Sequence, residues 1–265
     1  MNPEDDKAVA GISLDEAFAL LEEDATLLSV NNRLSAYLHD AYADTRQDDV
    51  WPTPDILPLG AWLAQQYDAL LIRGEASAQL LQPAQEALLW ELVVDDWNAS
   101  RGPDEMLLRP AAAAASARQA WRLIHDWEIA LEELQQFHIP ETRHFLQWAD
   151  AFESRCRDNS WMSRDWLARE ITQAVSQGSV VPPQTLLLGG FDEFTSAQQA
   201  LLRALSGAGA TLRLLETGMH RGDARQLLCA DIGQEILQAA WWARRKLEAG
   251  GVARIGIVVP KLHEH

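Results

Sequence analysis

A short apolar strand that ends in two glycines and an acidic pair most constrains the fold of this chain. Residues 185–188 predict a buried β-strand, and the two glycines that follow end it. Asp192 and Glu193 then stand at the exit of the strand, and Thr195 or Ser196 can cap the next helix. A strand, an acidic turn and an amphipathic helix in this order are typical of a parallel α/β sheet.

The same alternation of strands and helices occurs near both ends of the chain. A capping box at Ser13 and Glu16 predicts the start of a first helix. The remaining expected strands are 25–30, 211–215 and 254–259, and the expected helices are 32–43, 59–72, 196–206 and 234–249. Strands joined through helices predict a parallel sheet with crossover connections.

The middle of the chain is expected to be entirely helical, because no strand pattern interrupts residues 83–178. One stripe of apolar residues at three- and four-residue steps predicts a single long amphipathic helix: Ala117, Trp121, Ile124, Trp127, Leu131 and Leu134. We therefore expect an α/β domain over 1–80, an all-helical insert over 81–180, and the rest of the α/β domain from 181 to 265.

Composition and charge limit the class of protein and its partners. The hydrophobic content of 48% and the 11 tryptophans favour a folded protein. No segment has the pattern of a membrane helix or a signal peptide, and Cys156 and Cys229 have no redox spacing, so we expect a cytoplasmic location. Residues 1–159 carry 11 Lys and Arg against 29 Asp and Glu, a net charge of −18. This first part of the chain has either a solvated surface or an acidic face for a basic partner subunit.

The place of a phosphate-binding loop, directly after the first buried strand, holds Asn31, Asn32 and Arg33. Such a loop needs glycines that let backbone N–H groups approach the phosphates, a Lys for their charge, and a Ser or Thr for magnesium. No glycine lies between Gly11 and Gly60, and the GxxxxGK[ST] signature is absent from the whole chain. We therefore expect no bound nucleotide cofactor and no ATPase activity from this chain.

The other candidate site residues each have a structural alternative. Asp192 and Glu193 are placed to hold magnesium, or else to favour the following helix from a solvated loop. Most tryptophans lie on helical stripes, where core packing is the default, and Trp51, beside Pro52 and Pro54, is the best candidate for an exposed stacking residue. The histidines have no ligand spacing and no serine lies in GxSxG, so we expect neither a metal site nor a catalytic triad.

Four segments together resemble the first part of a superfamily I helicase-like protein of the AddB type, found in bacterial helicase–nuclease complexes. They are LLSVNNRL at 27–34, TPDILPLGAWL at 53–63, LGGFDEFT at 188–195 with the glutamines and leucines after it, and DIGQEI at 231–236 with AAWWAR at 239–244 and IGIVVP at 255–260.

The resemblance implies a P-loop NTPase-like sheet, a helicase motor domain 1A with a helical 1B insert. It makes residues 31–33 a degenerate Walker A position, Asp192 and Glu193 a Walker B pair, and Thr53 part of a segment that contacts single-stranded DNA. The last group of segments, over 231–260, resembles the entry to a second motor domain, so residues 181–265 are expected to hold the rest of the α/β domain and the start of that second domain. The family continues through this second motor domain and often a C-terminal nuclease, so we expect this chain to be part of a longer protein.

The departure at 31–35 resembles the inactivated helicases, which keep the fold as a DNA-scanning or scaffolding subunit. The leading hypothesis is therefore an inactivated helicase-like domain of a DNA repair or recombination protein, which binds a single strand, a duplex end or a helicase–nuclease partner subunit. Two alternatives remain open. One is a purely structural scaffold that docks through its acidic helical insert, and the other is a nucleotide hydrolase with a non-standard loop.

Overall fold

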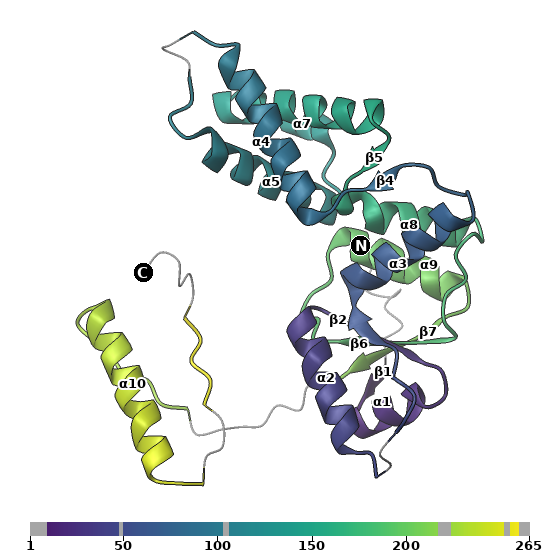
Figure 1. Cartoon of the computed structure of the whole chain (residues 1–265), viewed down its shortest axis with the longest axis vertical. Coiled ribbons are helices and arrows are strands. Elements are labelled where there is room, and N and C mark those ends of the chain that lie inside the picture. The colour runs from purple at the N-terminus through teal and green to yellow at the C-terminus, as the bar shows by residue number, and fades with distance from the viewer. Residues whose placement is uncertain (1–9, 48–49, 103–105, 217–223, 252–254, 260–265) are drawn as a thin grey trace. The chain divides into compact units, whose positions relative to one another are not determined.

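The computed structural model describes residues 10–47, 50–102, 106–216, 224–251 and 255–259, and it divides into two compact units, 1–218 and 219–265. The first unit contains a parallel sheet with the strand order β1-β7-β6-β2-β3 (Figure 1). Its strands are β1 (Ala10–Ile12), β2 (Thr26–Ser29), β3 (Ile56–Pro58), β6 (Thr185–Gly189) and β7 (Thr211–Leu215). The expectation of an α/β fold with a parallel sheet is confirmed, and the domain boundaries near 80 and 180 stay predictions.

Helices cover both faces of this sheet, as the continuous burial of β2 requires. On one face, Leu27 and Leu187 pack with α1 (Leu14–Leu21) and α2 (Asn32–Asp44). On the other, Leu28 and Leu188 pack in a core with α3 (Leu59–Ile72), α8 (Leu167–Ser176) and α9 (Ser196–Gly207). Alternate residues of each strand thus supply two separate cores, because successive side chains point to opposite faces of a sheet.

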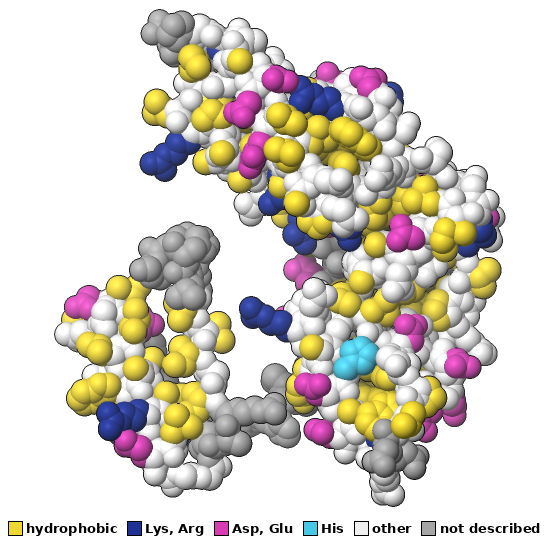
Figure 2. All heavy atoms as spheres, viewed as in Figure 1, with side chains coloured by type: hydrophobic (Ala, Val, Ile, Leu, Met, Phe, Trp, Pro, Cys, Tyr) yellow, Lys and Arg dark blue, Asp and Glu magenta, His cyan; other side chains and the backbone are white. Residues whose placement is uncertain are grey.

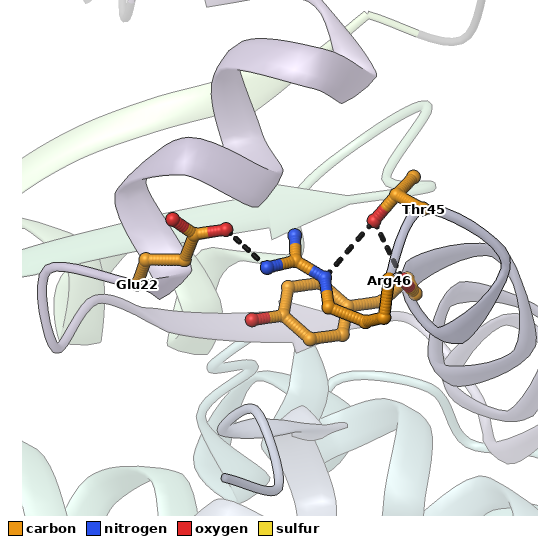
Figure 3. A network of polar contacts seen from close by, with 4 residues as sticks. Glu22, Thr45 and Arg46 are labelled. Atoms are coloured by element: carbon orange, nitrogen blue, oxygen red, sulfur yellow. Dashed lines mark hydrogen bonds and ion pairs between the residues drawn. The ribbon is translucent and has the colours of Figure 1, made fainter. Parts of the chain in front are cut away.

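The N-terminal helices are fixed at their ends by polar contacts that the sequence carries locally. Ser13 and Glu16 form the predicted capping box at the start of α1. Beyond the end of α2, Arg46 makes an ion pair with Glu22, donates to the Thr45 hydroxyl at 3.2 Å, and lies over the Tyr42 ring (Figure 3). This network connects the ends of α1 and α2 on the surface of the unit.

The helical insert consists of α4 (Pro83–Ala99), α5 (Pro110–Asp126), α6 (Leu131–Leu134) and α7 (Pro140–Asp158). Its core is aromatic: Trp90 stacks on Phe152 at 4.4 Å between ring centroids, and Trp121 packs against both. Two-residue strands β4 (Gln79–Leu80) and β5 (Trp161–Met162) pair in parallel where the insert joins the sheet-bearing part. The prediction of an uninterrupted helical middle therefore misses β5.

The long helix predicted from the stripe at 117–134 was also wrong. α5 ends at Asp126, the exposed Trp127 is its C-cap, and Glu128 has a φ of 52°. A left-handed residue cannot continue a right-handed helix, so Leu131 and Leu134 belong to a separate short turn of helix.

The second unit contains α10 (Ile232–Glu248), whose first turn is capped by Asp231 accepting from the Gln234 N–H at 2.8 Å. The predicted strand at 254–259 is not formed over 255–259, and Arg254 lies outside the described residues. A strand needs a hydrogen-bonded neighbour, and residues 255–259 pair with none of the described strands.

Candidate functional site

A cleft of about 1060 Å³ lies where the helical insert meets the carboxyl ends of the central strands. The sheet contributes the residues after β2, including Asn31 and Asn32, the start of α3, and Phe191 after β6. The insert contributes α4 and α5, and the segment before α8 adds Arg164 and Asp165. Because β2 and β6 are neighbours whose crossovers run in opposite directions, the cleft lies at the switch point of the sheet, where ligands bind in open α/β folds.

The turn between β2 and α2 is too short to wrap a phosphate. β2 ends at Ser29 and α2 begins at Asn32, so only two residues connect them. Asn31 is the N-cap of α2, and its side-chain oxygen accepts a 3.0 Å hydrogen bond from the N–H of Leu34. The Ser29 hydroxyl contacts the Ser35 hydroxyl at 2.7 Å and donates to the carbonyl of Asn31 at 2.9 Å. The polar side chains of Ser29, Asn31 and Ser35 therefore form their hydrogen bonds within this turn.

The residues at the end of β6 pack directly against the same turn. The Val30 N–H donates to the carbonyl of Gly189 at 3.0 Å, which extends the pairing of β2 and β6 to the end of both strands. Gly190 has a φ of 78°, and a Cβ built on it would lie 2.5 Å from Cδ2 of Leu34. The side chain of Leu34 thus lies directly against the glycine that follows β6.

The predicted residues are only partly brought together. Asn31 and Asn32 line the cleft, whereas Arg33, Asp192 and Glu193 are exposed and are not among its lining residues. The acidic pair belongs to the turn between Phe191 and Phe194, whose rings stack 5.0 Å apart. Thr195 forms a capping box with Gln198 at the start of α9, as the sequence predicts for a cap at this position. Among the described residues, no three His, Cys, Asp or Glu side chains are grouped to hold a metal ion.

The candidate stacking residues lie elsewhere. Trp51 is half-buried and packs against the core under α1 and α2, so the expectation that it is exposed was only partly right. Thr53 is exposed. Neither residue is among those that line the cleft.

The insert wall of the cleft holds charged residues that the sequence analysis did not identify. We call Arg118, Arg122 and Arg164 the arginine wall. The other ionisable groups among the described lining residues are the carboxylates of Glu86, Asp126 and Asp165. Figure 2 shows dark blue and magenta side chains together where the insert meets the sheet-bearing part. No local pattern reveals this grouping, because its members come from α4, α5 and the segment before α8.

One serine, Ser163, connects the carboxylate of Glu86 with the backbone of Asp165. Glu86 is buried and accepts hydrogen bonds from the Ser163 hydroxyl at 2.7 Å and from the Arg164 N–H at 3.3 Å. The same Ser163 oxygen accepts from the N–H of Asp165 at 3.3 Å. Burial raises the pKa of Asp165 to about 7, and the negative charges of Glu86 and Asp126 add to the rise. The positive charges of Arg122 and Arg118 act against it.

A smaller cavity of about 300 Å³ adjoins the other side of Asp165 and is lined by His125. The indole N–H of Trp166 donates to Nε2 of His125 at 3.1 Å, which fixes the imidazole with its proton on Nδ1. Burial, with a smaller effect of Arg169, lowers the pKa of His125 to about 4. His125 is therefore a neutral group near neutral pH, whereas Asp165 changes its charge there.

No protein-family model matches the chain, and no curated protein matches it. Among the described residues, no helix combines the length and apolar character needed to cross a bilayer. The geometry of the cleft is therefore the basis for the functional proposal.

Proposed function

We propose that this chain is an inactivated helicase-like domain of a DNA repair or recombination protein, which binds DNA or a partner subunit without hydrolysing ATP. The observation that carries the proposal is the two-residue turn between β2 and α2. A nucleotide triphosphate needs a longer loop with free backbone N–H groups and a Lys, and here Asn31 is used as a helix cap.

The architecture around this turn supports the helicase-like part of the proposal. A parallel sheet is interrupted after α3 by a helical insert, and the chain returns to the sheet in β6, beside β2. The resemblance implies this arrangement of a 1A-like sheet with a 1B-like insert. Asp192 and Glu193 follow β6 as a Walker B pair does, but they stand outside the cleft lining.

The arginine wall supports DNA as the ligand. Arg118 and Arg122 occupy successive turns of α5, and Arg164 adds a third guanidinium from the segment before α8. Arginine is well suited to phosphate because its planar fork donates two parallel hydrogen bonds. A cleft of this size also has room for nucleotides of a single strand.

A titration of this protein with labelled single-stranded oligothymidylate at low salt tests the proposal. We expect binding that weakens as salt is added, because phosphate contacts release counterions. Arg118→Ala should weaken it about three- to tenfold and lower the salt slope by about 0.7, whereas the matched Arg203→Ala, on the exposed side of α9, should not. Absence of binding to a single strand and to a duplex end would contradict the DNA proposal.

One observation favours a scaffold as the second candidate. The loop after α5 and the following helix α6 expose Glu128, Glu132 and Glu133, an acidic stretch of the insert that suits a basic partner. If the wild-type protein binds no DNA and a basic partner subunit is captured in a manner that charge reversal at Glu132 and Glu133 abolishes, the scaffold is the better account.

A further inference from the structure

We infer that the carboxyl group of Asp165 sets the charge of the cleft, so that uptake of one proton leaves the lining around the arginine wall with a net positive charge that binds the backbone phosphates of single-stranded DNA. The inference rests on the proposed function and adds its regulation. It begins from the composition of the cleft, whose described lining residues contain three arginines and three carboxylates. With every group ionised their formal charges cancel, and one proton leaves the lining positive.

The three carboxylates are not equivalent. Glu86 is buried and its oxygens are engaged by Ser163 and by the Arg164 N–H. Asp126 forms an ion pair with Arg122 at 3.6 Å, one turn away on α5. Asp165 has no such ion pair among the described residues, and its carboxyl group lies close enough to both Glu86 and Asp126 to be affected by their charge. It is therefore the acid whose ionisation is least compensated.

Asp165 is held in this position by packing from several sides. It is the middle residue of the short 3₁₀ segment 164–166, which contacts α5 and α8, and it lines both cavities. The charged and titratable groups that line these cavities around it are Glu86 from α4, Arg118, Arg122, His125 and Asp126 from α5, Arg164 beside it, Arg169 from α8, Glu153 from α7, and Glu128 and Glu132 after α5.

Two of these neighbours decide how the change in charge is transmitted. Arg118 and Arg122 line the same cleft as Asp165, so an ionised Asp165 offsets part of the positive charge that an external phosphate would meet there. His125 adds no charge in this pH range, because its pKa of about 4 keeps it neutral. The burial of Asp165 and its acidic neighbours place its own pKa at about 7, so the switch operates near neutral pH.

The test measures binding of a short oligothymidylate without terminal phosphates, carrying a dye that does not titrate, at about pH 6 and about pH 8 and constant ionic strength. Internal phosphodiesters keep their charge over this range. We expect the wild-type protein to bind about five- to tenfold more tightly at the lower pH, since one linked proton changes affinity by at most tenfold per pH unit.

Substitutions at Asp165 test whether its protonation causes the pH dependence of binding. Asp165→Asn should bind at the higher pH as tightly as the wild type does at the lower, with an affinity ratio near one between the two. Asp165→Ala should also lose the pH dependence. Asp68→Asn removes the same formal charge from the exposed side of α3, outside the cleft, and should keep the wild-type ratio.

The outcomes separate this inference from the proposed function. DNA binding whose pH dependence is unchanged in Asp165→Asn, or is absent from the wild type, overturns the control by Asp165 and leaves the DNA proposal standing. No binding at either pH contradicts both.

Discussion

The hydroxyl of Ser163 donates a 2.7 Å hydrogen bond to the carboxylate of Glu86, a residue 77 positions earlier in the chain, and both side chains are buried. The contact joins the first turn of α4 to the segment before α8. It therefore connects the two ends of the insert beside the cleft. The Ser163 oxygen also accepts from the backbone N–H of Asp165, which sets the position of that residue.

Removal of the Ser163 hydroxyl should destabilise the protein. Ser163→Ala leaves a buried carboxylate oxygen without its partner, and we expect the free energy of unfolding to fall by about 1–3 kcal/mol. The matched Ser176→Ala removes an exposed hydroxyl that bonds the Thr172 carbonyl, and should change stability by less than about 0.5 kcal/mol. Urea unfolding of both variants measures the difference, and equal effects would show that the buried bond adds no stability.

A side chain at Gly190 should disturb the packing of β6 against the turn between β2 and α2. Gly190→Ala requires a φ of 78° and a contact 2.5 Å from Cδ2 of Leu34, so we expect a loss of about 1–3 kcal/mol. Gly207→Ala, in α9, meets nothing within 4 Å and should be neutral or stabilising by up to about 1 kcal/mol. Thermal unfolding compares the two, and a neutral Gly190→Ala would mean that Leu34 is not packed there.

The stability of the insert should depend on its aromatic core. Phe152 is fully buried between Trp90 and Trp121, and Phe152→Ala should lower the free energy of unfolding by about 3–5 kcal/mol. Phe137→Ala alters an exposed ring after α6 and should have little effect. Denaturant unfolding followed by tryptophan fluorescence measures both, and similar small losses would contradict this assignment of the core.

Stability should also depend on pH through Asp165. Its folded-state pKa of about 7 exceeds the model-peptide value of 3.8, so the folded protein retains a proton that the unfolded chain releases. The stabilising contribution is therefore present at low pH and is lost as pH rises through about 7. Relative to wild type, Asp165→Asn should gain about 1–2 kcal/mol between about pH 5 and about pH 8. An unchanged difference across that range would place the pKa of Asp165 near its ordinary value.

The sequence predicted the elements whose signals are local. The cap residues Ser13 and Thr195 gave the starts of α1 and α9, and the apolar runs gave β2, β6 and β7. It did not predict β1, β3, β4 and β5 as strands, because strands of two or three residues have too few positions to show a period and are stabilised by their partners. It also missed the turn at Glu128, whose left-handed φ has no glycine to announce it.

The site was predicted only on its sheet side. Asn31 and Asn32 follow a strand that the sequence reveals, and the rule for parallel sheets places them at the edge where the cleft lies. The opposite wall depends on tertiary contacts across long separations, as between Glu86 and Ser163. Whether an isolated arginine such as Arg118 faces a cleft or solvent cannot be decided from spacing alone.

The most direct test of the central claim is a calorimetric titration of this protein with ATP and magnesium, with phosphate release followed in the same samples. The closed turn at Asn31 predicts neither binding at millimolar nucleotide nor turnover, with or without single-stranded DNA. Asp192→Asn should behave like the wild type. Saturable ATP binding with turnover that Asp192→Asn abolishes would contradict the account and identify an active hydrolase with a non-standard loop.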